Sequence, residues 1–228
     1  RVGREIAVIE GDSALGAARV KSDSTCVALS PERGEVLLEL KSSLCDMLSS
    51  CECEAIIQVV GAGSGRTFDL EQVRYEKIIL MSDADVDNAH VRTLLLTLFF
   101  RYMRPLVEAG RVYAAVPPLH RVETAGRHKE VIYTYSQQEL TDLLKSLEKA
   151  GKTYKQPIQR YKGLGEMDAD QLAETTMQPS NRMLRRITAV DAAAGERTFE
   201  LLMGNEVAPR RDFIVDSADD FDREKIDA

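Results

Sequence analysis

The strongest indication of the fold is Lys77-Ile-Ile-Leu-Met-Ser-Asp-Ala-Asp-Val-Asp87, an apolar run that ends in three carboxylates. Far upstream, Ile6-Ala-Val-Ile-Glu-Gly-Asp12 follows the same pattern, because its apolar run ends in Glu10. We expect each run to form a buried strand. If the two strands lie side by side in a parallel sheet, their carboxyl ends share the crevice in which α/β folds bind ligands.

The clustered carboxylates at these two strand ends predict a magnesium site. Like charges that are crowded together repel one another unless a cation lies among them. Carboxylate oxygens are also the ligands that Mg²⁺ prefers in proteins. The candidate ligands are Glu10, Asp83, Asp85 and Asp87.

Other readings of the acidic triplet are less consistent with its neighbours. An EF-hand calcium loop needs glycine at its sixth position and glutamate at its twelfth. The chain has Asn88 and Leu94 there, which excludes that loop. A phosphotransferase of the haloacid-dehalogenase type also carries Asp-x-Asp after a strand, but usually continues to Thr or Val where this chain has Asp87. That reading and a simple solvated acidic turn stay open.

Strands and helices alternate through the first half of the chain. Between the two acidic strands, Ser13 is expected to cap a helix over residues 14–20. Residues 88–108 have one apolar face at helical spacing, Gly110 follows as a stop, and residues 111–116 form a further strand. This alternation predicts a Rossmann-like α/β fold, a mostly parallel sheet flanked by helices.

The pair Pro117-Pro118 marks the predicted domain boundary. We expect a metal-binding domain over residues 1–116 and a smaller α+β tail region over residues 117–228. The tail region begins with a hairpin over 119–135 and a helix over 137–150, and its flexible acidic end starts near residue 215. Arg160-Tyr-Lys-Gly-Leu-Gly-Glu-Met167 forms a glycine-containing loop that is suited to a phosphate or subunit contact.

Bulk composition limits the function classes. The 228 residues are 44% apolar, which is ordinary for a globular protein, and the longest apolar run, 94–100, is too short to span a bilayer. The net charge of −7 argues against nucleic acid, but −5 of it lies in residues 212–228 (seven acids against two bases) and leaves the body near neutral. We expect reduced thiols, and we expect a piece of a longer protein, since the chain opens at Arg1 without a signal peptide.

Two further motifs carry little weight alone. Gly61-Ala-Gly-Ser-Gly65 invites a dinucleotide-binding reading, but Arg66 replaces the third glycine of that fingerprint, so a plain loop is the better interpretation. His90 follows the acidic cluster by about one helical turn. Because a lone histidine at a helix start is usually structural, we expect it only to support the metal ligands.

Taken in order, the motifs resemble one family. These are Glu10-Gly-Asp-Ser13, Asp83-Ala-Asp-Val-Asp87 with His90, Pro117-Pro-Leu119, the 160–167 motif, Glu174-Thr-Thr-Met177, Leu202-Met-Gly204 and Pro209-Arg-Arg211. Essentially the whole chain resembles the TOPRIM domain and C-terminal tail of a bacterial type IIA topoisomerase B subunit, of the DNA gyrase or topoisomerase IV kind. Two glycine-containing segments, Glu10–Gly16 and Gly61–Arg66, are more similar to topoisomerase IV or actinobacterial forms.

The resemblance implies the Mg²⁺-binding half of a DNA cleavage-religation centre. Glu10, Asp83 and Asp85 would be the catalytic and metal-binding acids, Asp87 would assist, and His90 and Ser13 would lie behind them. Glu10 would also act as general acid in cleavage and as base in religation. The resemblance further implies double-stranded DNA and an A subunit that carries the cleaving tyrosine as partners, in a cytoplasmic, nucleoid-associated heterotetramer without a membrane role. ATP would bind only to an N-terminal domain outside this chain.

The DNA-facing positions depart from the family's pattern. By motif, Asp12, Arg19, Arg33 and Lys162 match positions near DNA and drugs. Arg19 and Ser22 stand where Lys and another basic residue are common, and acidic or apolar residues replace family residues at Glu32, Glu35 and Leu38. Each exchange of Lys for Glu removes a phosphate partner and adds a repulsion. These departures keep a second hypothesis open, a diverged, non-catalytic module that binds the A subunit or DNA without supporting cleavage.

Overall fold

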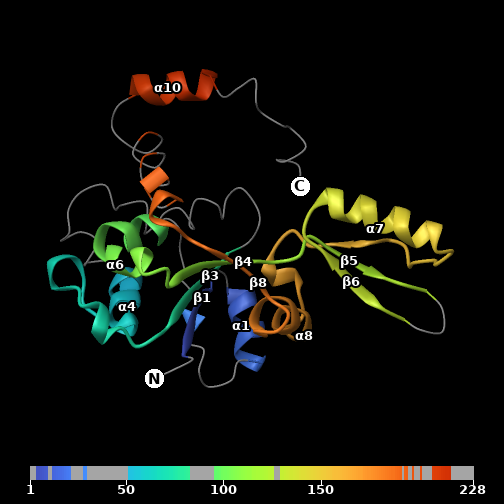
Figure 1. The fold of residues 1–228 in the computed structure, drawn as a ribbon, viewed down its shortest axis with the longest axis horizontal. Coiled ribbons are helices and arrows are strands. Elements are labelled where there is room, and N and C mark those ends of the chain that lie inside the picture. The colour runs from blue at the N-terminus through green and yellow to red at the C-terminus, as the bar shows by residue number, and fades with distance from the viewer. Residues whose placement is uncertain are drawn as a thin grey trace.

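The protein folds into a larger unit around a five-stranded sheet and a smaller lobe around a three-stranded sheet (Figure 1). The structure is a computed structural model that describes residues 4–9, 12–21, 28–29, 51–82, 95–125, 129–191, 193–194, 197, 201 and 207–216. Within these ranges no helix is long and apolar enough to cross a membrane.

The larger sheet confirms the predicted α/β class with mostly parallel strands. Its order is β2 (Ala28–Leu29), β1 (Glu5–Ile9), β3 (Lys77–Met81), β4 (Val112–Val116) and β8 (Met183–Arg186). The first four strands run parallel, whereas β8 pairs antiparallel with β4. The sheet is therefore completed by a strand that comes from beyond residue 117.

The period-two alternation of the strands divides the core into two layers. Ile6 and Val8 of β1 face the layer that contains α4 (Cys51–Val60), helical residues 95–102 and α6 (Arg104–Glu108). Ala7 and Ile9 face the opposite layer, where α1 (Asp12–Lys21) and α8 (Ala169–Leu172) pack. Helices therefore cover both faces, as a mostly parallel sheet requires.

The helix predicted over residues 88–108 is not continuous. Residues 95–102 are helical, but Met103 leaves helical geometry with φ −136° and ψ 36° before α6 begins. Pro105 explains the break, because it lacks the N–H that would bond to the preceding turn and fits only the first turn of a new helix. Gly110 ends α6 with φ +68°, as predicted, and residues 88–94 lie outside the described part.

The elements between residue 51 and the start of β3 are helical. Residues 52–60, which the pattern leaves ambiguous, belong to α4. Two single-turn helices follow, η1 (Gly65–Thr67) and η2 (Leu70–Gln72), and Asp69 caps η2 by accepting from the Glu71 amide. The glycine segment 61–65 is therefore a turn that leads into η1, in keeping with the plain-loop interpretation.

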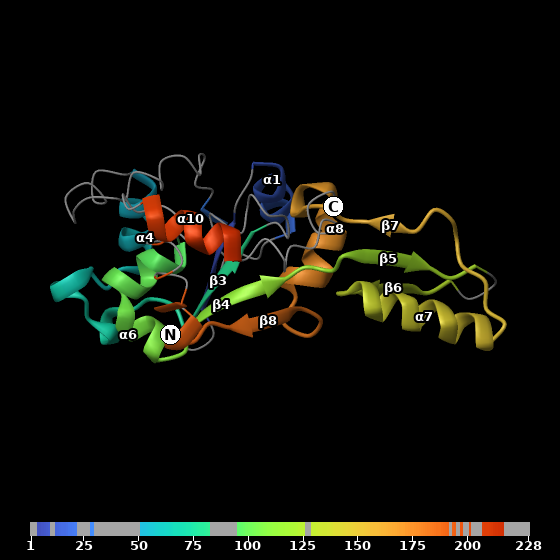
Figure 2. The ribbon, with the colours of Figure 1, turned by 90° about the horizontal axis from the view of Figure 1, so that it is seen from above.

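The small lobe comprises β5 (His120–Glu123), β6 (Val131–Thr134), β7 (Gln159–Arg160) and α7 (Gln137–Lys149), with strand order β6-β5-β7. Helix α7 lies along one face of this sheet, and the lobe projects from one side of the larger unit (Figure 2). Its own core contains Val122, Leu140 and Leu147. The hairpin and helix predicted for this region are both present.

The segment after the small lobe returns to the larger unit. It forms η3 (Leu164–Glu166), α8, a π-helix η4 (Ala173–Met177), β8 and finally α10 (Val207–Asp216). Helix α10 lies apart from the other elements in Figure 1, and Val207, Phe213 and Val215 on it are exposed. The acidic end beyond residue 216 lies outside the described residues, and the domain division at residue 117 stays a prediction.

Candidate metal and DNA-binding site

Strands β1 and β3 end side by side, which is the condition for the predicted metal site. They pair in parallel from Glu5 opposite Lys77 to Ile9 opposite Met81. In the sequence Glu10 follows Ile9 directly, and Asp83 follows Met81 after the buried Ser82. The candidate side chains of Glu10, Asp83, Asp85, Asp87, His90 and Arg33 themselves lie outside the described residues.

Helix α1 starts at Asp12, immediately after the first of these strand ends. The expectation that Ser13 is the N-cap is therefore wrong, because Ser13 already lies inside the helix. Its exposed hydroxyl instead donates to the carbonyl oxygen of Gly165, 3.3 Å away. Arg19 lies exposed on the same helix, and the side chain of Asp12 is outside the described part.

The loop Tyr161–Met167, here called the 161–167 loop, contains Lys162 and contacts the start of α1 through Gly165. Tyr161, Leu164 and Met167 are at most 4% exposed and belong to the core layer of α1 and α8. Lys162 lies between two of these anchors and is exposed. Among the described residues, no carboxylate forms an ion pair with its side chain.

The amino ends of the same two strands are joined by a largely buried ion network. The Glu5 carboxylate lies 2.8 Å from Nζ of Lys77 and 2.6 Å from Nη2 of Arg182, whose side chain is 6% exposed. Burial favours the neutral acid, but the hydrogen bonds from Lys77 and Arg182 outweigh it and lower the pKa of Glu5. Arg182, which precedes β8, thus ties the C-terminal segment to both strands.

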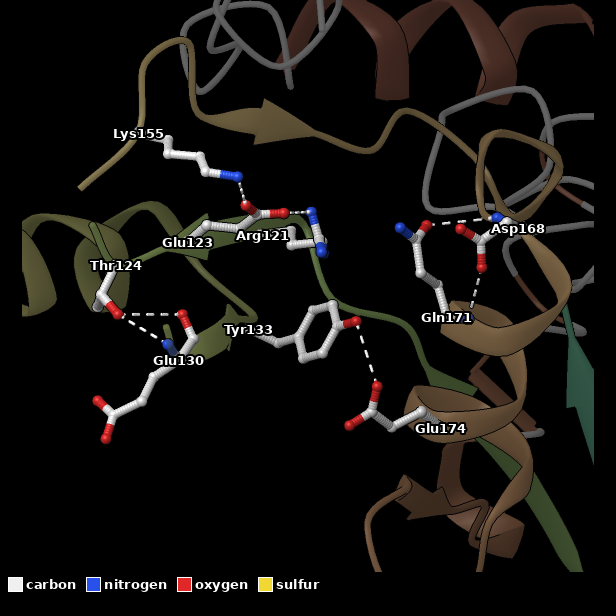
Figure 3. Close-up of polar contacts among 9 residues, drawn as sticks. All are labelled: Arg121, Glu123, Thr124, Glu130, Tyr133, Lys155, Asp168, Gln171 and Glu174. Atoms are coloured by element: carbon white, nitrogen blue, oxygen red, sulfur yellow. Dashed lines mark hydrogen bonds and ion pairs between the residues drawn. The ribbon is translucent and has the colours of Figure 1, made fainter. Parts of the chain in front are cut away.

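A second polar cluster lies where the small lobe meets the larger unit (Figure 3). Lys155 and then Arg121 pair with the Glu123 carboxylate and lower its pKa. On the neighbouring strand, the Tyr133 hydroxyl lies 3.5 Å from the carboxylate of Glu174 on η4. Sequence reasoning missed this cluster, although the alternation of Arg121 and Glu123 along β5 was a signal for a polar sheet face.

Two buried polar atoms in this junction have no hydrogen-bond partner in the described structure: the Tyr161 hydroxyl oxygen and Nε of Arg121. Burial raises the pKa of Tyr161 far above its usual range, so the phenol is neutral. No group of three metal-ligating side chains occurs among the described residues. The candidate metal site therefore rests on the two strand ends and the acids that follow them in the sequence.

Comparison of the sequence with known protein families gives two matches, one over the first four strands of the larger sheet and one over the segment that returns to it. Residues 5–117 match the Toprim domain, and residues 153–215 match the carboxyl terminus of the DNA gyrase B subunit. The chain belongs to the family of DNA gyrase and topoisomerase IV B subunits. The Toprim match spans β1 to β4, and the gyrase B match contributes β8, which completes their sheet.

Similarity to individual B subunits runs along almost the whole chain. It is 50% identical over 218 residues to the B subunit of DNA gyrase from Thermus thermophilus, covering 94% of this chain and 33% of that protein. It is 49% identical over 214 residues to the B subunit of DNA topoisomerase 4 from Streptococcus pneumoniae, covering 93% and 32%. The chain thus spans about a third of the length of these relatives, and the near-equal identities favour neither type.

Proposed function

We propose that this chain is the Mg²⁺-binding part of the DNA cleavage-religation centre of a type IIA topoisomerase. The observation that carries the proposal is the parallel register of β1 and β3, which ends with Ile9 opposite Met81. Consecutive Cα atoms are about 3.8 Å apart, so the acids that follow can lie only a short distance from this shared edge.

The residues that would hold the metal are Glu10, Asp83 and Asp85, with Asp87 assisting. Their carboxylate oxygens fit a hard cation, and the shared strand edge supports their convergence. The bound cation would offset negative charge on the phosphate and on the leaving oxygen. Glu10 would donate a proton to the leaving 3′ oxygen in cleavage and take it back in religation.

The DNA backbone would lie across the same edge of the sheet. Arg19, Arg33 and Lys162 would contact phosphates, and Asp12 would lie close to the DNA or to an inhibitor bound there. Lys162 and Arg19 are both exposed, Arg19 in the last turn of α1 and Lys162 in the loop whose Gly165 contacts Ser13 near the start of that helix, which supports this arrangement. Each such contact adds affinity that weakens with salt.

Cleavage would need parts that lie on other polypeptides or outside this chain. The attacking tyrosine would come from an A subunit, ATP hydrolysis from another region of the B subunit, and the assembly would be a heterotetramer. The division into a metal-binding domain over residues 1–116 and a tail region over 117–228 that contacts the A subunit is part of this proposal. Because its substrate would be the chromosome, the enzyme would act in the cytoplasm.

Reconstitution of the full-length B subunit with its A subunit tests the proposal. Wild type should cleave DNA only with Mg²⁺ and change its topology with ATP. Asp83→Asn and Asp85→Asn should each lower cleavage at least a hundredfold and weaken Mg²⁺ binding in calorimetry. Asp142→Asn is the matched control, because this exposed acid of α7 loses the same charge away from the strand ends.

The same experiment separates the second hypothesis from the first. The acids Glu32 and Glu35 motivate it, since they occupy positions where the family usually has apolar or basic residues. A non-catalytic module would bind the A subunit or DNA, yet would form no cleaved product with Mg²⁺. Wild-type cleavage that survives the loss of Asp83 and Asp85 would refute the metal assignment.

A further inference from the structure

The 161–167 loop is held rigidly by a regular set of contacts. Its buried residues recur every third position, at Tyr161, Leu164 and Met167, which matches the single 3₁₀ turn of η3. The amide of Lys162 donates to the Glu166 carboxylate over 2.9 Å, which closes the loop across its outer side. The backbone of Lys162 therefore has little freedom of its own, and its position follows that of the loop.

The position of the loop depends on a close approach to α1. Gly165 presents its carbonyl to the Ser13 hydroxyl, and a Cβ added at Gly165 would lie 3.3 Å from Cβ and 3.4 Å from Oγ of Ser13. Such distances are tighter than most Cβ contacts, so a larger residue would require the loop or Ser13 to shift by a few tenths of an ångström. Ser13 lies three positions after Glu10, which makes this contact a direct link between the loop and the strand end.

We propose that Ser13 and Gly165 are positioning residues that set the place of the Lys162 ammonium relative to the carboxyl ends of β1 and β3. The inference rests on the proposed function, because the ammonium would contact a DNA phosphate beside the metal. Gly165 permits the loop to approach α1 closely, and the hydrogen bond from the Ser13 hydroxyl sets the distance between them. A displaced loop would carry the charge away from the phosphate without altering the metal ligands.

A double-mutant cycle in the reconstituted full-length enzyme tests this inference. The measured quantity is the DNA dissociation constant as a function of salt concentration. Lys162→Ala should weaken binding about threefold to tenfold and reduce the salt slope by about one. Gly165→Ala should produce a smaller loss of the same kind. In the Lys162→Ala background Gly165→Ala should have almost no further effect, because the charge that it displaces is gone.

Three variants separate positioning from a general loss of stability. Gly16→Ala is the matched control, since a Cβ at this exposed glycine of α1 meets no atom within 4 Å. Ser13→Gly combined with Gly165→Ala removes the opposing Cβ and Oγ and should recover part of the lost affinity. Ser13→Ala alone deletes the hydroxyl, and its effect should also vanish in the Lys162→Ala background even if Gly165→Ala folds poorly.

The outcomes distinguish this inference from the proposed function. If wild type neither binds nor cleaves DNA, the function itself fails. If wild type is active but Gly165→Ala and Ser13→Ala reduce affinity equally with and without Lys162, the positioning role is overturned. Unchanged affinity and salt slope in both variants would overturn it as well.

Discussion

His120 illustrates how one side chain in the small lobe makes stability depend on pH. It is 5% exposed on β5, and its Nδ1 lies 3.2 Å from the Thr134 hydroxyl on the neighbouring strand. Burial, and then the positive charge of Arg160, lower the pKa of His120 below its ordinary value of 6.5. The folded protein therefore keeps this ring neutral at pH values where the unfolded chain protonates it.

This shift predicts a loss of stability in mild acid. Because the folded pKa is lowered, the contribution is fully present above about pH 6.5 and is lost as the pH falls toward and through the folded pKa. The free energy of unfolding, measured by urea denaturation at pH 7.5 and 5.5, should fall more in wild type than in His120→Gln. An equal fall in both proteins would contradict the prediction.

At the scale of elements, the ion network of Glu5, Lys77 and Arg182 joins β1, β3 and the segment before β8. Nη1 of Arg182 also donates to the carbonyl of Met177, at the end of η4. The network therefore holds a π-helix, an edge strand and two central strands in one arrangement. Removing one partner would leave a largely buried charge without compensation.

Matched substitutions of glutamate measure this connection. Glu5→Gln should lower the free energy of unfolding by about 3 kcal/mol, since it leaves the buried guanidinium of Arg182 without its carboxylate. Glu108→Gln removes an exposed pair with Arg104 within α6, for which we expect less than about 0.5 kcal/mol. The free energies of unfolding are measured by urea denaturation at neutral pH. Similar losses in the two variants would show that the network of Glu5 stabilises the fold no more than an exposed ion pair does.

At the scale of the whole molecule, the small lobe is inserted in the sequence between β4 and the segment that returns to the larger unit. Its first and last strands lie together, since His120 pairs with Arg160 and the amide of Tyr161 donates to the carbonyl of Leu119. The lobe has its own core, and the contact between Tyr133 and Glu174 helps to join it to η4. This arrangement favours local opening of the lobe while the larger sheet stays folded.

Hydrogen exchange can test that independence. Leu147→Ala leaves a cavity in the lobe core and should destabilise it by about 2–4 kcal/mol. Amides of β5, β6 and α7 should then exchange faster, while those of β1 and β3 should keep their protection. Leu98→Ala, in the core of the larger unit, should show the reverse pattern. Uniformly faster exchange in either variant would indicate a single cooperative unit.

Much of the fold could be predicted because its signals are local. The apolar runs that became β1 and β3 are each bounded by acids within a few residues, and their alternation with helical segments indicates a parallel sheet. The same acids carry the metal prediction, which stays a prediction here. The break at Met103 was missed because periodicity alone does not show that Pro105 opens a new helix.

Residue types at short spacing were enough to predict the class of fold, the two strands that lead to the candidate metal ligands, and the family. The contacts between residues far apart in the sequence became visible only in the folded protein. Ser13 meets Gly165 across 152 positions, and Glu5 meets Arg182 across 177. Hydrophobic periodicity does not predict such contacts, because they depend on how β8 and the 161–167 loop return to the sheet.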